Sequence, residues 1–193
     1  MEVNFSQSNF YDNTKRSTAL IKSLREIEIR HSSLEYEVGV LLSLDGEIIK
    51  EWVGTEDEIS IPIEDFKNKD LWNGNIFTHN HTRGLHFSPD DIDIFINVPL
   101  LEIRASTPFN MYFSISKKKG LNLKLYDEML KDKVGSFSKG MEIAVEQGIN
   151  FNTKDFINKL YNFRIDHADN WFKNNADKYN YIYEKGAYKN DNI

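Results

Sequence analysis

Apolar residues recur at two different spacings along the chain, and these spacings predict an alternation of helices and strands. Residues 14–30 repeat apolar positions every three or four residues, which is typical of an amphipathic helix. Residues 34–54 hold two runs rich in Val, Ile and Leu that flank an Asp-Gly pair, and this arrangement predicts a β-hairpin. Residues 58–63 alternate between apolar and polar and predict a further short strand.

The rest of the chain continues this alternation and then becomes helical. In order, the pattern predicts a helix over 64–73, a buried strand over 75–79, a helix from Ser88 to Pro99, and strands over 100–106 and 109–115. From residue 121 onward the spacing is helical, and the residues are polar and aromatic. We expect an α/β fold, with a mixed β-sheet flanked by helices over 1–120 and a helical C-terminal extension over 121–193. Aromatic residues near the chain end either dock the last helix onto its own domain or form an interface; they are Trp171, Phe172 and the tyrosines at 179, 181 and 183.

One segment, FTHNHTRGLHFSPDD at residues 77–91, concentrates three of the five histidines. His79 and His81 are two positions apart at the end of a predicted strand, so their imidazoles point to the same side. Asp91 lies in the first turn of the following predicted helix, which a short loop would bring back over the strand end. Two imidazoles and one carboxylate then surround a point, as in a catalytic zinc site that keeps a fourth position for water. The sequence therefore predicts a Zn²⁺ site.

Two further side chains fit the chemistry of such a site. The predicted strand over 35–44 places Glu35 and Glu37 on one face, beside a glycine that leaves space. We favour Glu37 as the general base for a metal-bound water because it lies deeper in the strand, and Glu35 stays the alternative. Ser88 supplies a hydroxyl that either caps the helix or takes part in catalysis.

Each of these features has a simpler explanation when it is taken alone. A histidine at a strand end is often only hydrogen-bonded, a serine before a helix is an ordinary cap, and acids on a strand often face solvent. The combination of the three features is what favours a site. His86, in the same segment, is expected to be a bystander or a substrate contact.

Composition narrows the classes of function. The formal net charge of −6 argues against a nucleic-acid partner, because the whole molecule does not attract polyanions. The chain has no cysteine, which excludes disulfide scaffolds, cysteine-ligated zinc and a thiol nucleophile. No stretch approaches the roughly 20 apolar residues that span a bilayer, and the first residues lack the pattern of a secretion signal. We therefore expect a cytoplasmic protein without a membrane partner.

These residues resemble the motif of the JAB/MPN (JAMM) metalloprotease superfamily, which is a Glu on an early strand, then His-x-His, a short loop and Ser-x-x-Asp. The matching positions are Glu37, His79-Asn80-His81 and Ser88-Pro89-Asp90-Asp91. The resemblance covers roughly residues 30–116. VLLSLDGEII before THNH is similar to the bacterial RadC-like branch, and FTHNHTRGLHFSPDDI with LEIRAS is similar to JAB-like domains attached to phage minor head proteins. Two features depart from the common pattern: Thr82 replaces a proline, and the loop before Ser88 is one residue shorter than in the eukaryotic deubiquitinases.

The resemblance implies a JAB/MPN layering, similar to that of cytidine deaminases, and a zinc-dependent hydrolase of peptide or isopeptide bonds. In this family the residues matching His79, His81 and Asp91 hold the zinc. Glu37 would then transfer the proton, and Ser88 would donate a hydrogen bond to the oxyanion. The implied substrate is a protein or peptide, such as a ubiquitin-like conjugate or a phage or bacterial protein. Two alternatives remain: a non-catalytic phage- or RadC-like interaction module, and a metal-dependent nuclease, against which the acidic balance argues.

Overall fold

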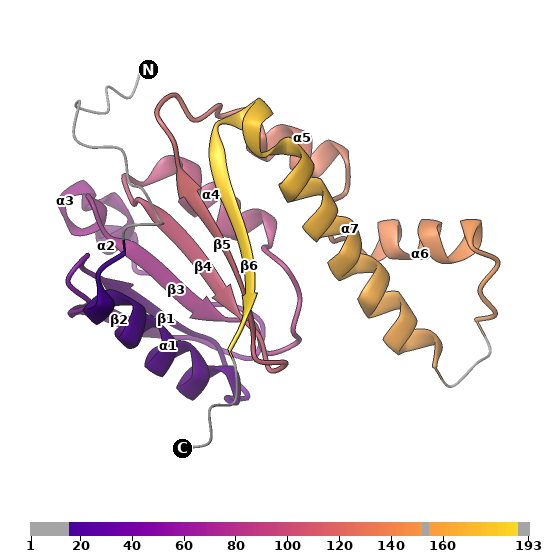
Figure 1. Cartoon of the computed structure of the whole chain (residues 1–193), viewed down its shortest axis with the longest axis horizontal. Helices are drawn as coiled ribbons and strands as arrows, with labels where there is room; N and C mark the ends of the chain where they lie inside the picture. The colour runs from indigo at the N-terminus through magenta and orange to yellow at the C-terminus, as the bar shows by residue number, and fades with distance from the viewer. Residues whose placement is uncertain (1–15, 152–154, 189–193) are drawn as a thin grey trace.

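The computed structural model describes residues 16–151 and 155–188, and its centre is a six-stranded mixed β-sheet (Figure 1). The strands lie in the order β2-β1-β3-β4-β5-β6. Their bounds are Val38–Leu42 for β1, Ile48–Val53 for β2, Ile76–Asn80 for β3, Glu102–Ser106 for β4, Met111–Lys117 for β5 and Tyr181–Ala187 for β6. β3 and β4 pair in parallel, and the other neighbours are antiparallel. The predicted α/β class with a mixed sheet is confirmed.

Helices cover both faces of this sheet. Their bounds are Thr18–Ser32 for α1, Ile63–Lys67 for α2, Lys69–Trp72 for α3, Pro89–Asn97 for α4, Leu125–Lys131 for α5, Phe137–Glu146 for α6 and Phe156–Tyr179 for α7. On one face, the apolar side of α1 packs on β1 and β3, where Leu24 and Val40 are buried. On the other face, α4, α5 and α7 enclose a larger core that includes Phe77, Phe95 and Phe172. Because side chains alternate along a strand, the central strands contribute to both cores.

Most of the elements predicted before residue 118 are confirmed. The first helix begins after Ser17, whose hydroxyl accepts a hydrogen bond from the amide of Leu20 at 3.1 Å. β1 and β2 form the predicted hairpin, and Gly46 in its turn has a φ of +84°, which favours glycine. β3, α4, β4 and β5 also lie within one or two residues of their predicted places. None of the described helices combines the length and the apolar composition needed to span a membrane.

Two local predictions are wrong. Residues 58–62 form no strand, because the chain turns sharply after β2, with the amide of Thr55 donating to the carbonyl of Glu58 at 2.8 Å. Pro62 also has no N–H to donate to a sheet ladder, and Ile59 packs against the end of the core instead. The helix predicted over 64–73 is divided at Asn68, whose side chain accepts a hydrogen bond from the amide of Leu71 and so caps α3.

The C-terminal extension is not only helical, which corrects the prediction for 181–187. α7 ends at Tyr179, the following Asn180 has a left-handed φ of 57°, and the chain then returns as β6 along the edge of β5 (Figure 1). The alternation of Tyr181 and Tyr183 with Ile182 is a strand pattern that the preceding helical period obscured. Trp171, Phe172, Tyr179 and Tyr181 lie in the large core, and Tyr183 packs against it, so the aromatic residues dock the last helix onto the sheet. The division of the chain at residue 120 stays a prediction.

Candidate metal centre

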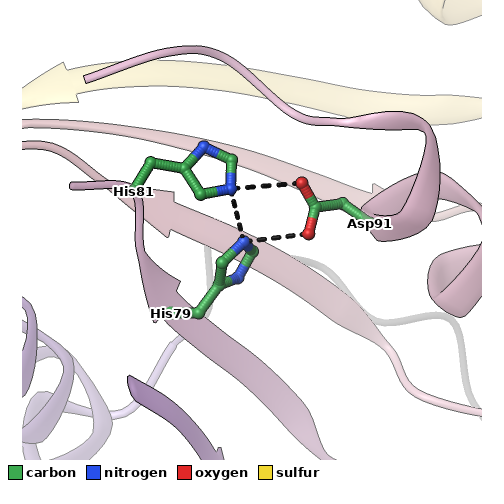
Figure 2. A group of neighbouring side chains, drawn as sticks. All are labelled: His79, His81 and Asp91. Atoms are coloured by element: carbon green, nitrogen blue, oxygen red, sulfur yellow. Dashed lines mark hydrogen bonds and ion pairs between the residues drawn. The ribbon is translucent and has the colours of Figure 1, made fainter. Parts of the chain in front are cut away.

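The end of β3 brings two imidazoles to one side of the sheet. His79 lies on β3 and His81 directly follows it, so both point to the same face, with their ring centroids 4.6 Å apart. The ring of His79 stacks on Phe77, with centroids 5.3 Å apart and planes at 15°. Both histidines are buried. The strand therefore presents two Nε2 atoms, 2.8 Å apart, toward α4 (Figure 2).

The first turn of α4 supplies a carboxylate opposite these rings. Ser88 caps the helix, and its hydroxyl accepts from the amide of Asp91 at 3.2 Å. In return, Oδ2 of Asp91 accepts from the amide of Ser88 at 2.7 Å and from its hydroxyl at 2.9 Å, which completes a capping box. The same carboxylate faces the histidines, with Oδ1 2.9 Å from His79 Nε2 and Oδ2 3.2 Å from His81 Nε2 (Figure 2).

This triad has the donor set and the spacing of a metal site. Two neutral imidazoles and a carboxylate suit zinc and other first-row ions. With metal–ligand bonds of about 2.0–2.1 Å, tetrahedral ligands lie roughly 3.3 Å apart. The observed separations of 2.8, 2.9 and 3.2 Å therefore need to widen by only a few tenths of an ångström. Within residues 16–151 and 155–188, no other group of three or more such side chains converges in this way. The triad could therefore hold a metal ion.

The orientation of each imidazole has its own cause. Nδ1 of His81 lies 2.9 Å from the carbonyl of Leu85, so Nδ1 carries the hydrogen and Nε2 keeps a lone pair for a metal. Nδ1 of His79 is buried and has no hydrogen-bond partner among the described residues. Packing against Phe77 orients the His79 ring instead. A metal ligand usually has both kinds of support, and His79 has only the second.

Electrostatics couples the three groups. Burial by itself would raise the pKa of Asp91, but the imidazoles of His79 and His81 hold this pKa well below its usual value. Burial by itself would lower the pKa of His81, but Asp91, Glu37 and the carbonyl of Leu85 raise it to about 9. Metal binding would therefore compete with protonation of His81.

Glu37, the predicted base, lies at the same site, and Glu35 does not. Glu37 lines an open cavity of about 370 Å³ together with His81, Ser88 and Asp91, whereas Glu35 is exposed and does not line it. Glu37 is 9% exposed, and burial is the main cause that raises the pKa of its carboxyl group, with the two histidines opposing it. The remaining lining residues are Glu56, Asp57, Glu58, Ile59, Thr82, Arg83, Leu85, Asp90 and Ile94.

Asn80, which the sequence did not single out, holds the chain on both sides of Glu37. Its Oδ1 accepts from the amide of Val38 at 2.7 Å, and its Nδ2 donates to the carbonyl of Tyr36 at 2.9 Å. Its side chain is fully buried, so the bond to Val38 is shielded from water, and the bond to Tyr36 is partly buried. The middle residue of the His-x-His segment thus ties the predicted base to the strand that carries the ligands. In the sequence, the feature that could have pointed to Asn80 is a polar residue at the end of a strand predicted to be buried.

The loop between His81 and Ser88 is fixed by specific contacts. The hydroxyl of Thr82 donates to the carbonyl of Glu56 at 2.7 Å. Gly84 has a φ of +67°, and a Cβ there would lie 2.4 Å from the ring of Phe109. His86 is buried in the large core against Phe172 and does not line the cavity, so it is not a substrate contact in this structure.

Comparisons with protein-family models, with curated proteins and with solved structures found no match to this chain. The geometry of the triad therefore stands on its own, and the resemblance to the JAB/MPN superfamily stays a prediction.

Proposed function

We propose that this chain is a zinc-dependent hydrolase of peptide or isopeptide bonds, of the JAB/MPN type. The observation that carries the proposal is the meeting of three buried ligands with a buried carboxyl group beside an open cavity. Three protein ligands leave a position for water, and a carboxylate of raised pKa is suited to take a proton from that water. The ligand set alone is compatible with several hydrolytic reactions. The choice of a peptide or isopeptide bond as the bond that is cleaved rests on the resemblance to the JAB/MPN motif.

The residues would act as follows. A zinc ion held by His79, His81 and Asp91 would polarise the substrate carbonyl and lower the pKa of water. Glu37 accepts the proton of the attacking water and passes it to the leaving amine nitrogen. Ser88 donates to the oxyanion that develops on the carbonyl, which requires its hydroxyl hydrogen to rotate away from Asp91 Oδ2. The Ser88 Oγ is already fixed by the helix cap, so only the hydrogen moves.

The cavity favours substrates that carry positive charge. Besides Glu37 and Asp91, its lining includes four carboxylates, namely Glu56, Asp57, Glu58 and Asp90. Arg83 is the cation of the lining, and it already pairs with Asp57 at 2.8 Å and with Glu56 at 3.4 Å. Such a surface attracts lysine or arginine side chains and repels phosphates. This argues for a basic polypeptide as the substrate and against a nuclease.

The test is hydrolysis by the zinc-loaded chain, with Glu37→Gln as the critical variant. Fluorogenic peptide and lysine-isopeptide substrates with basic flanking residues are compared with acidic ones. We expect Glu37→Gln to keep about one zinc per chain and to lose at least roughly 100-fold in turnover, as is usual for a general base. Glu35→Gln is the matched control, because Glu35 is exposed beside the same strand, and it should retain activity.

The opposite results would identify a different function. Purified protein that takes up no zinc at neutral pH would contradict the metal centre and favour a non-catalytic interaction module. Equal turnover in Glu37→Gln and in the unchanged chain would contradict the role of Glu37. Cleavage of plasmid DNA that depends on His79 would favour the nuclease.

A further inference from the structure

The C-terminal part of the chain reaches the metal-binding loop through His86. The imidazole of His86 stacks on Phe172 of α7, with centroids 4.7 Å apart and planes at 7°, and lies 4.1 Å from the ring of Phe113 on β5. Nε2 of His86 lies 2.9 Å from the hydroxyl of Tyr183 on β6. Two elements that lie far from the loop in sequence, α7 and β6, therefore both contact it at His86, and α7 also contacts it through Phe87, whose ring centroid lies 5.8 Å from that of Phe172.

The hydrogen bonds around His86 form a series in which each group accepts from one neighbour and donates to the next. The amide of Phe87 donates to Nδ1 of His86 at 2.8 Å, so the ring hydrogen must lie on Nε2 and is donated to Tyr183. The hydroxyl of Tyr183 in turn donates to Oδ1 of Asp169 on α7 at 2.5 Å. The other oxygen of Asp169 accepts from Lys185 at 3.2 Å. Burial holds the pKa of His86 well below its usual value, so the ring stays neutral and this series keeps its direction.

The neighbour of His86 is the residue that orients a metal ligand. The carbonyl of Leu85 lies 2.9 Å from Nδ1 of His81 and sets which nitrogen of that ring faces the metal. The imidazole of His86 joins the loop to β6, because it accepts a hydrogen bond from the amide of Phe87 and donates one to Tyr183.

We propose that His86, held by Tyr183 and Asp169, is a positioning residue that keeps the Leu85 carbonyl on His81, so that α7 and β6 are a structural part of the metal centre. This inference rests on the proposed function, because it assigns His81 as a metal ligand. It goes further than the expectation that residues 121–193 form a C-terminal extension packed on or beside the first domain. The bonded chain runs from Asp169 on α7 through Tyr183 to the loop.

Two tyrosines on opposite faces of the same sheet allow a matched test. Tyr183→Phe removes the hydroxyl that joins His86 to Asp169. Tyr112→Phe removes a hydroxyl that donates to Glu184 at 2.5 Å on the opposite face, where no metal ligand lies. Both tyrosines are half-buried and both bonds end on a carboxylate, so similar losses of thermal stability are expected. His86→Phe is the third variant, and it keeps a ring against Phe172.

Two readouts separate positioning from stability. The first is the affinity for zinc, measured by competition with a chelator, together with the absorption spectrum of the cobalt-substituted protein. We expect Tyr183→Phe and His86→Phe to weaken zinc binding about tenfold, the lower end of the effect of losing a partner behind a ligand. The second readout is the ring ¹⁵N resonances of His81 in the metal-free protein, which report the Leu85 contact directly and which both variants should shift. Tyr112→Phe should leave both readouts at the wild-type values.

The inference is overturned if Tyr183→Phe leaves the His81 resonances unchanged, or if Tyr112→Phe alters them as much. Failure of the proposed function looks different, since the wild-type chain would then bind no zinc. In that case the His81 resonances of the metal-free variants still decide whether His86 positions the loop.

Discussion

A buried ion-pair network on the face of the sheet opposite the metal centre leads to a quantitative prediction. Arg104 on β4 donates to both carboxylate oxygens of Glu28 on α1, at 2.6 and 3.1 Å, and to Glu102 at 2.9 Å. All three side chains are buried, and the guanidinium also lies 4.3 Å from the ring centroid of Tyr112. Arg104 is thus the cation that joins α1 to the middle of the sheet.

The substitution Arg104→Met removes this cation and keeps most of the side-chain volume. Glu102 retains Arg16 as a partner at 2.6 Å, whereas Glu28 retains only the hydroxyl of Thr78 among the described residues. Removing one member of a buried pair costs about 3–5 kcal/mol, because the remaining charge is left without compensation. We expect Arg104→Met to lower the free energy of unfolding by about 4 kcal/mol, a large part of the ~5–15 kcal/mol typical of a domain.

The double variant Glu28→Met/Arg104→Met tests the cause of this loss. It leaves no carboxylate stranded at the α1 position, so it should be more stable than Arg104→Met alone by about 2 kcal/mol. Urea unfolding at pH 7 measures all variants, with equal m-values as the condition for comparing them. Arg83→Met is the matched control, since it breaks an exposed pair with Asp57 and should cost less than about 1 kcal/mol.

Two results would refute this reasoning. One is a double variant less stable than Arg104→Met, because the two losses would then add like independent contacts. The other is a loss in Arg104→Met no larger than that in Arg83→Met. The zinc affinity of folded Arg104→Met should stay within about threefold of the wild-type value, because His79 and Arg104 face opposite sides of the sheet.

Three further predictions concern the metal centre and its loop. Zinc at about 100 times its dissociation constant should stabilise the chain by about 2.7 kcal/mol and raise the melting temperature by roughly 5–10 °C, and His79→Ala should abolish this shift in a thermal melt. In chelator-treated protein, the pKa of His81 is raised from 6.5 to about 9, so its stabilising contribution is complete below pH 6.5 and is lost as the pH rises through 9. Urea unfolding at pH 6 and pH 9.5 should therefore differ by about 3 kcal/mol from this group, and His81→Gln should remove the difference. Gly84→Ala should cost at least ~1 kcal/mol more than Gly74→Ala, because both glycines have positive φ but only at Gly84 would a Cβ meet a ring, that of Phe109; equal losses in urea would contradict the clash.

The convergence of His79, His81 and Asp91 could be predicted because the geometry of the three residues is local. His79 and His81 share a face through the two-residue period of a strand, and Asp91 is placed by a serine cap and a proline at the start of a helix. These rules depend only on neighbours in the chain. The same locality explains why the hairpin and the first helix could be predicted.

Features that depend on distant residues could not be predicted in the same way. The strand β6 pairs with β5, and the helical period of the preceding residues gave no indication of that partner. Residues 58–62 alternate like a strand, but the turn at Thr55 and the missing N–H of Pro62 direct them away from the sheet. Alternation shows that a segment can be half-buried, and only the tertiary partners decide what covers it.

The candidate metal centre combines both kinds of information. Its candidate ligands lie within residues 79–91, together with Asn80, His86 and the Leu85 carbonyl that contacts His81, but the partners that hold Asn80 and His86 come from elsewhere in the chain. Asn80 reaches across 42 positions to the amide of Val38, and His86 reaches across 97 positions to Tyr183. A short motif therefore specifies which atoms can bind the metal, and the rest of the fold determines whether those atoms stay in place. For that reason a test confined to the ligands would miss half of what the centre requires, and variants at Tyr183 are as informative as variants at His81.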